Sequence, residues 1–188
     1  MNYALIKEMD VADGPGIRTS LFVSGCKHKC KGCFNEDIWE FDTGKEFTYD
    51  TIEYIVKLLK RDYIKGLTLL GGEPLDPDNQ EWVYKLVVRV REEVPNKTIW
   101  CYTGYTYEFV IGYMYKKLPY TKKLLDLVDV LVDGKFIQDL LDLKLQFRGS
   151  ANQRVIDLRK TEKEHKIIWA LGKEEEAKYR KRKQTNNI

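Results

Sequence analysis

The chain has little that would mark it as secreted, membrane-spanning or nucleic-acid-binding. No long uncharged apolar run occurs, since even the stretch 124–132 contains Asp126 and Asp129, so we expect no membrane span. The first ten residues lack the basic start, apolar centre and small-residue cleavage site of a secretory signal. A net charge of +3, from 32 basic and 29 acidic residues, is far from the strongly basic surface typical of nucleic-acid-binding proteins. We therefore expect a cytoplasmic protein that does not bind nucleic acid directly.

Cysteine is also scarce, and its placement argues against disulfides. The 188 residues include four cysteines, and three of them fall close together at Cys26, Cys30 and Cys33. Such a cluster is too tight for a disulfide framework and, in a reducing compartment, more often binds metal. Thiolates suit iron–sulfur clusters or zinc, and both a 4Fe-4S cluster and a structural zinc site normally take four ligands. The residues alone leave two alternatives, which are a cluster with one open iron or a zinc site completed by His28 or Cys101.

The pattern of apolar residues predicts alternating strands and helices. A length of 188 residues with 43% hydrophobic residues fits one domain with a sizeable core. The candidate strands are 21–23, 67–70, 99–102 and 130–132. Helical spacing predicts one helix after a possible cap at Thr48 and a second that stops before Pro95. Strand and helix in alternation argue for a parallel sheet, with the helices on one side of it or wrapping it into a barrel.

Four short polar or glycine-containing motifs follow these four strands. They are the cysteine segment, Gly71-Gly72-Glu73-Pro74, Thr103-Gly104 and Asp133-Gly134-Lys135, in chain order. Because the carboxyl ends of parallel strands meet at one edge of a sheet, we expect the four motifs at a common rim. Glycine pairs let a backbone approach a ligand closely, and Glu73 offers acceptors for a positively charged amino group.

Together these motifs resemble those of the radical S-adenosylmethionine enzymes, and within them the activating enzymes of glycyl radical enzymes. The resemblance rests on the cysteine order, the segment 13–19 and Gly71-Gly72-Glu73-Pro74. Segments 100–105, 130–136 and 147–153 are similar to those of the activating enzymes of anaerobic ribonucleotide reductase. Most of the superfamily has an aromatic residue before the third cysteine, whereas here Gly32 precedes it and Phe34 follows it. The reductase-activating enzymes resemble this arrangement.

The resemblance implies a fold, a cofactor pair and a set of site residues. The implied fold is α/β, a shortened and incomplete (β/α) barrel with mostly parallel strands over residues 1–157, followed by a charged C-terminal extension at 158–188. The implied cofactors are a 4Fe-4S cluster, held by Cys26, Cys30 and Cys33, and S-adenosylmethionine bound to its open iron. Residues implied to bind the latter are Gly32, Cys33, Phe34, Gly71, Gly72 and Glu73. No side chain is expected to act as a catalytic acid or base.

The implied activity is that of an oxidoreductase, which cleaves S-adenosylmethionine reductively and generates a glycyl radical on its target. The implied partners are the large catalytic subunit of anaerobic ribonucleotide reductase and a flavodoxin-like electron donor. Two alternatives remain, a radical enzyme acting on another glycyl radical enzyme or a small molecule (deazapurine synthase type), and a non-catalytic zinc-binding interaction module. The individual roles of Asp133, Lys135, Arg148 and Asn152 stay open.

Several segments outside these motifs carry weaker expectations. Cys101 lies in an apolar pattern and is expected to be a small buried hydrophobic residue, while His28 is expected to face solvent or to lie near the cluster. The segment 13–16 is interpreted as a lid, a partner-facing loop or a plain connection. In the extension, Ile167, Ile168 and Leu171 suggest an amphipathic helix. The basic run 178–183 is interpreted as a solvated helix or a frayed end in preference to a binding arm.

Overall fold

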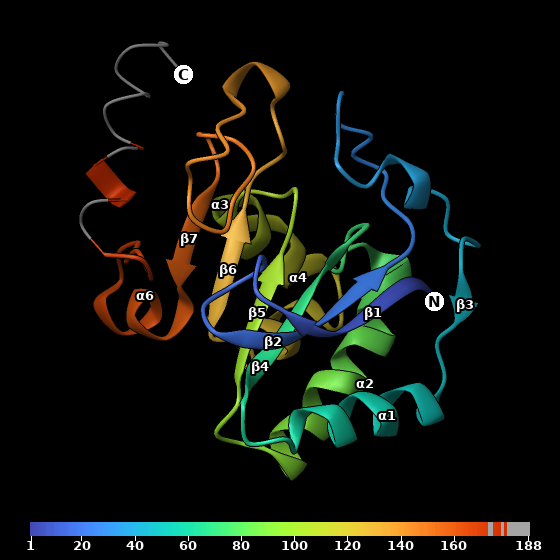
Figure 1. Cartoon of the computed structure of the whole chain (residues 1–188). Coiled ribbons are helices and arrows are strands. Elements are labelled where there is room, and N and C mark those ends of the chain that lie inside the picture. Colours follow the sequence, from blue (N-terminus) through green and yellow to red (C-terminus); the bar gives the residue numbers. More distant parts are fainter. Residues whose placement is uncertain (173–174, 178, 180–188) are drawn as a thin grey trace.

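The computed structural model describes residues 1–172, 175–177 and 179. In this part of the chain, seven strands form one open sheet with the order β3-β1-β2-β4-β5-β6-β7 (Figure 1). The strands are β1 (Asn2–Asp10), β2 (Ile17–Val23), β3 (Lys45–Glu46), β4 (Ile64–Gly71), β5 (Thr98–Tyr102), β6 (Val130–Asp133) and β7 (Arg154–Asp157). The central β2, β4, β5 and β6 are parallel, whereas β1, β3 and β7 pair antiparallel with their neighbours. The predicted α/β class is confirmed, as a mixed sheet that does not close.

The helices lie mainly on one face of this sheet. They are α1 (Tyr49–Leu59), α2 (Pro77–Glu93), α3 (Tyr107–Phe109), η2 (Val110–Met114, a π-helical turn), α4 (Tyr115–Lys117), α5 (Thr121–Leu125) and α6 (Leu158–Glu164), with short 3-10 turns η1 (Glu36–Ile38) and η3 (Gln138–Leu140). Figure 1 shows α1 and α2 side by side against the sheet. All four predicted strands are present, and each is longer than predicted.

The two predicted helices begin and end where their capping residues place them. Thr48 caps α1, because its side chain accepts a hydrogen bond from the backbone N–H of Thr51. In return, the side chain of Thr51 accepts a hydrogen bond from the backbone N–H of Thr48. Asp76 caps α2 by accepting from the N–H of Asp78, and Pro77 occupies the first helical position. The helix ends at Glu93, shortly before Pro95. The apolar faces of both helices are buried.

The sheet has an apolar face and a mixed face. Toward the helices it buries Leu21, Leu69, Ile99, Cys101 and Leu131, which confirms Cys101 as a core residue. The opposite face carries a smaller cluster, Trp100, Val130, Val132 and Val155, together with the fully buried Arg18. The C-terminal ends of the parallel strands β2, β4, β5 and β6 lie at the same end of the sheet, which is here named the rim.

The C-terminal extension does not fold as predicted. The chain leaves α6 at Glu164, and His165 adopts a left-handed conformation with φ of 51°, which ends the helix. The predicted amphipathic helix around Ile168 is therefore wrong. Instead this segment runs beside β7, where Trp169 bridges Ile156. The basic run 178–183 lies, apart from Tyr179, outside the described residues.

Candidate functional site

The three clustered cysteines lie in a loop that follows β2 and is anchored at its start. The backbone N–H groups of Gly25 and Cys26 donate to the carbonyl oxygens of Ile38 and Trp39, at 2.9 and 2.8 Å. Cys26, Cys30 and Cys33 all line one cavity of about 550 Å³, here named the cysteine cavity. The structure thus brings the predicted ligands to one wall at the rim, with Cys26 buried and the other two half-buried.

Each of the three sulfur atoms faces backbone N–H groups. Burial raises the pKa of the Cys26 thiol to about 11, and the N–H groups of His28 and Lys29 oppose that rise. Burial, then the neighbouring Cys33, raises the pKa of Cys30, which receives a backbone N–H. The sulfur of Cys33 accepts from the N–H of Asn35 at 3.4 Å. N–H donors around sulfur stabilise bound thiolates and are one means by which proteins adjust iron–sulfur clusters.

The thiols are not drawn together around a single point. Among the described residues, no three side chains of Cys, His, Asp or Glu are gathered closely enough to hold one metal ion. A four-iron cluster puts each thiolate on a different iron, so its ligands spread around a larger group than a zinc site requires. Cys101 is fully buried away from the cavity, which excludes it as a fourth zinc ligand in this arrangement.

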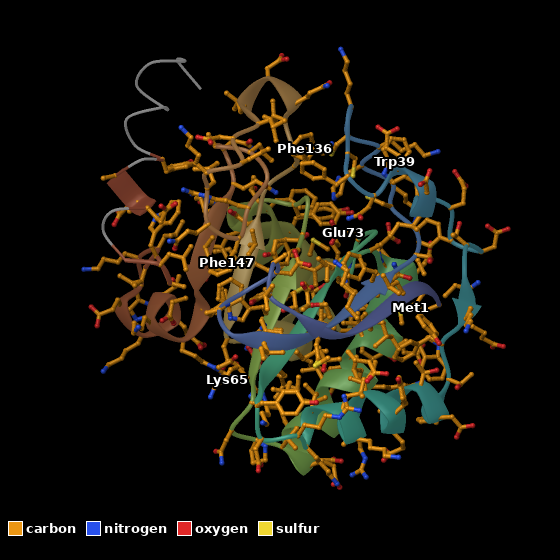
Figure 2. The ribbon with its side chains drawn as sticks, in the orientation of Figure 1. Met1, Trp39, Lys65, Glu73, Phe136 and Phe147 are labelled. Carbon is orange, nitrogen blue, oxygen red and sulfur yellow. The ribbon has the colours of Figure 1, made fainter. Side chains whose placement is uncertain are left out.

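Glu73 is a buried side chain with three hydrogen-bond contacts at the rim, where Figure 2 shows it below Trp39 and Phe136. One carboxylate oxygen accepts from the N–H of Leu75 at 2.9 Å. The other accepts from the N–H of Gly104 at 2.7 Å and is 2.9 Å from Nε2 of His28. His28 therefore does not face solvent, since its side chain is only 9% exposed and stacks edge-on against Tyr105. This contact joins the cysteine loop to the ends of β4 and β5.

The glycine pair before Glu73 allows the backbone at the end of β4 to lie close to the backbone of the cysteine loop. A Cβ on Gly72 would lie 2.5 Å from the carbonyl oxygen of Gly25, and Gly71 has φ of +104°. The N–H of Gly72 donates to Val23 at 2.7 Å, and the N–H of Glu73 donates to Gly25 at 2.8 Å. Both glycines line the cysteine cavity. Their conformational freedom lets the end of β4 lie directly against the start of the cysteine loop.

Gly32 and Phe34, which flank the third cysteine, occupy different surroundings. Phe34 lines the cysteine cavity, is 66% exposed and packs its ring 5.2 Å from that of Phe136. Gly32 is not among the residues that line this cavity. It has φ of +70°, and a Cβ there would lie 2.8 Å from the side chain of Gln138. Of the predicted site residues, all of which fall in the described part of the chain, Gly32 alone lies away from the cavity wall.

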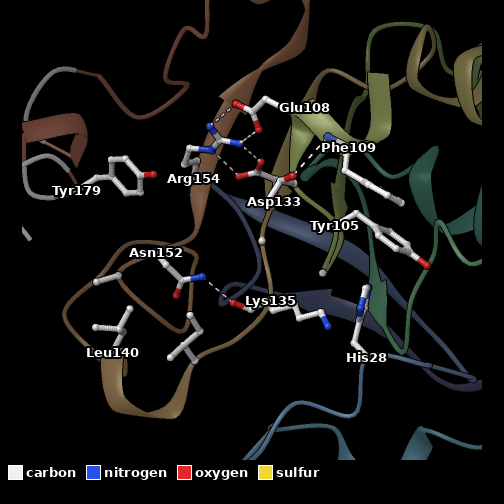
Figure 3. Close-up of a pocket in the computed structure, with 15 residues that line it drawn as sticks. His28, Tyr105, Glu108, Phe109, Asp133, Lys135, Leu140, Asn152, Arg154 and Tyr179 are labelled. Atoms are coloured by element: carbon white, nitrogen blue, oxygen red, sulfur yellow. Dashed lines mark hydrogen bonds and ion pairs between the residues drawn. The ribbon is translucent and has the colours of Figure 1, made fainter. Parts of the chain in front are cut away.

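A second cavity of about 770 Å³ adjoins the first (Figure 3). His28, Gly104 and Gly134 line both. Its other lining residues include the aromatic rings of Tyr105 and Phe109. Sequence reasoning missed this cavity, because its walls come from segments that only the folded sheet brings together.

An ionic network forms one wall of the second cavity. The guanidinium of Arg154 donates to both carboxylate oxygens of the buried Asp133 and to Glu108 at 2.8 and 2.7 Å. Asp133 also accepts from the N–H of Tyr107 at 2.7 Å. Asp133 is therefore a structural anchor of this wall. Lys135, by contrast, points into the cavity in Figure 3, and its ammonium group makes no ion pair with any described residue.

The segment 13–16 covers the mixed face of the sheet. Asp13 lines the cysteine cavity, and burial together with the adjacent Asp10 raises its pKa to about 7. Gly14 packs on the side chain of Arg18, since a Cβ there would lie 2.7 Å from it. Arg18 in turn donates to Thr68 at 2.7 Å and stacks over Trp100. This segment is thus part of the cavity wall.

Comparison with known proteins places this geometry in a family. Residues 12–156 match the family model described as "4Fe-4S single cluster domain". A protein of Vibrio cholerae serotype O1 is 46% identical over 155 residues, which is 81% of this chain and 96% of that protein. Relatives of Escherichia coli strain K12 and Enterobacteria phage T4 are each 44% identical, over 85% and 82% of this chain and 100% and 93% of their own lengths. All three are named anaerobic ribonucleoside-triphosphate reductase-activating protein.

The chain belongs to this family of reductase-activating proteins. The family expected from the sequence motifs is therefore confirmed, and so, at the level of the family, is the 4Fe-4S cofactor. Among the described residues of this family member, no helix is long and apolar enough to cross a membrane. The family match ends at residue 156, so α6 and the segment after it lie beyond the matched domain.

Proposed function

We propose that this protein activates anaerobic ribonucleoside-triphosphate reductase by cleaving S-adenosylmethionine reductively and thereby generating a glycyl radical on the reductase. The observation that carries the proposal is the convergence of three cysteines and Glu73 on one cavity, in a chain of the reductase-activating family. The balance of the reaction is simple. One electron breaks the bond between sulfur and the 5′ carbon, methionine leaves, and the 5′-deoxyadenosyl radical takes a hydrogen atom from a glycine Cα.

Cys26, Cys30 and Cys33 would hold the cluster. Their soft thiolate donors fit iron, and the N–H groups that face each sulfur fit the charge of a bound cluster. When bound and reduced, the cluster supplies the electron for the cleavage. The protein contributes the position of the ligands, the backbone dipoles around them and a cavity that limits access of water.

The cofactor S-adenosylmethionine would lie along the same cavity. Phe34 offers a ring for packing, Cys33 offers backbone groups, and Gly71 and Gly72 keep the wall free of side chains. Gly32, which precedes Cys33 but does not line the cavity, would act through the shape of the loop. Glu73 would bind the amino group. Because one of its oxygens is already bonded to Gly104 and His28, an ammonium group there would share or take the place of His28.

The remaining features of the proposal concern fold, partners and location. We propose that residues 1–157 form an incomplete barrel of the radical S-adenosylmethionine type and that 158–188 are an added extension. The partner is the large catalytic subunit of the reductase, which presents its glycine loop at the rim. A flavodoxin-like protein supplies the electron, and a reducing cytoplasm is the compartment that suits this chemistry.

Anaerobic reconstitution with iron and sulfide tests the proposal. The wild-type protein should become brown and release 5′-deoxyadenosine only when both a reductant and S-adenosylmethionine are present. Cys26→Ala, Cys30→Ala and Cys33→Ala should each abolish this release. Cys101→Ala is the matched control and should keep it, because Cys101 is buried in the core. A reconstituted wild-type cluster that never cleaves S-adenosylmethionine, or a colourless protein that binds only zinc, would contradict the proposal.

Addition of purified reductase tests the target. A glycyl radical signal in electron paramagnetic resonance should appear on the reductase after incubation with the reconstituted protein and S-adenosylmethionine. Cleavage without any radical on the reductase would instead favour a different glycyl radical enzyme or a small-molecule substrate.

A further inference from the structure

The C-terminal extension reaches back to the site from outside the matched family domain. After His165, the N–H of Ala170 donates to the carbonyl oxygen of Val155 at 2.9 Å, and the N–H of Asp157 donates to that of Ile168 at 2.8 Å. These bonds fix the extension along β7. The match to the family model ends at residue 156, so the extension lies outside the matched domain.

A buried ion pair fastens the next part of the extension to the cysteine cavity. Glu175 accepts from Arg148 at 2.7 Å, and the two side chains are 4% and 0% exposed. Arg148 lines the cysteine cavity and also stacks over the ring of Trp169 at 4.9 Å. An ion pair removed from water to this degree holds its two segments in a fixed relation, because separating two buried opposite charges is costly.

The same part of the extension places an aromatic ring in the second cavity. Tyr179 packs against Trp169 with ring centroids 5.3 Å apart and lines the cavity. In Figure 3 its ring points inward, on the side opposite Tyr105 and Phe109. The extension therefore supplies a wall that the matched domain does not contain.

We propose that Tyr179 is a recognition residue for the glycine-bearing loop of the reductase and that Glu175 is the residue that positions it. This inference rests on the proposed function. The cysteine cavity is lined by the residues assigned to the cluster and, except for Gly32, by those assigned to S-adenosylmethionine, and it shares His28, Gly104 and Gly134 with the adjoining second cavity. The second cavity therefore lies directly beside the place where the radical would form, where a polypeptide that reaches the radical can pack against its walls.

The lining of the second cavity suits a peptide segment. A volume of about 770 Å³ falls within the range of sites that take drug-sized ligands. Its aromatic rings offer packing surface at low cost in conformational entropy, and Lys135 offers a cation to a backbone carbonyl or an acidic side chain. The extension is a fixed wall of this approach, because its buried ion pair resists displacement.

The test measures radical formation on the reductase as a function of reductase concentration, beside cofactor cleavage without reductase. Tyr179→Ala should raise the half-saturating reductase concentration roughly fivefold, by loss of one aromatic contact. Tyr179→Phe should stay within about twofold of wild type, because the ring makes the contact. Tyr63→Ala is the control, since Tyr63 is an exposed tyrosine just before the N-terminal end of β4, at the end of the strand opposite the rim.

Glu175→Gln tests whether the buried ion pair positions Tyr179. We expect it to raise the half-saturating concentration in the same direction, with a smaller change in the maximal rate. An unchanged half-saturating concentration in Tyr179→Ala overturns the inference. The inference is also overturned if Tyr179→Ala lowers cofactor cleavage as much as it lowers radical formation, because Tyr179 would then contribute to binding the cofactor and not the reductase. If wild-type protein fails to cleave S-adenosylmethionine at all, the proposed function itself fails, which is a distinct result.

Discussion

Replacing Asp13 with asparagine should stabilise the protein at alkaline pH and much less in acid. Burial, a hydrogen bond with Asp10 and the charge of Asp10 raise the pKa of Asp13 from 3.8 to about 7. Between these two values the folded protein holds a proton that the unfolded chain has released, so stability falls as pH rises through this window. Above about pH 7 the carboxylate of Asp13 is charged in the folded protein, and its full cost to the free energy of unfolding is present. Asparagine removes that charge.

The magnitude follows from the size of the shift and from the surroundings. A shift of roughly three pKa units corresponds to at most about 4 kcal/mol. Asp13 is only half-buried, and the pKa of Asp10 is lowered, which has the opposite effect on stability. After a discount for solvent screening, we expect the advantage of Asp13→Asn to grow by about 1–2 kcal/mol between pH 5 and pH 8.

Urea denaturation under anaerobic conditions at the two pH values measures this difference. Asp62→Asn is a matched control, because Asp62 is exposed in the turn before β4 and its replacement should change the free energy of unfolding by less than about 0.5 kcal/mol. If Asp13→Asn is as stable as wild type at pH 8, or if its advantage is equally large at pH 5, the explanation from a buried carboxyl pair is wrong.

Three further predictions concern the fold. Glu175→Gln should lower the free energy of unfolding by about 3 kcal/mol, measured in urea, because it removes the negative charge from a buried ion pair. Gly66→Ala should destabilise by more than about 3 kcal/mol and yield little soluble protein, since its Cβ would lie 1.9 Å from the carbonyl oxygen of Thr98. Gly112→Ala should instead stabilise by about 0.5–1 kcal/mol in the same assay, because it is exposed in a helical segment and its Cβ would meet nothing within 4 Å.

The central fold was predictable because its signals are local and strong. Buried parallel strands read as continuous apolar runs, and the cap at Thr48 and the stop before Pro95 mark helix ends in the sequence itself. The antiparallel strands were missed for a physical reason. β1 is only partly buried and β3 has two exposed residues, so neither produces an apolar run. β7 is short and contains the charged Arg154.

The gathering of the site's motifs was predictable, and the contacts between them were less so. The rule that motifs after parallel strands meet at one rim placed the cysteines beside Glu73 correctly. The contact of His28 with Glu73 and the network of Arg154 with Asp133 depend on the relation of distant segments, which no local pattern contains. The helix predicted around Ile168 failed because a single left-handed residue redirected the chain onto β7.

The fastening of the cysteine loop bears on how the protein acquires iron. Backbone bonds fix Gly25 and Cys26 against Ile38 and Trp39, while Cys30 remains half-exposed at the cavity mouth. Small zinc fingers need their metal as a template for folding. Here the sheet has its own apolar core and backbone bonds hold the start of the cysteine loop, so we expect the domain to fold without iron as a template.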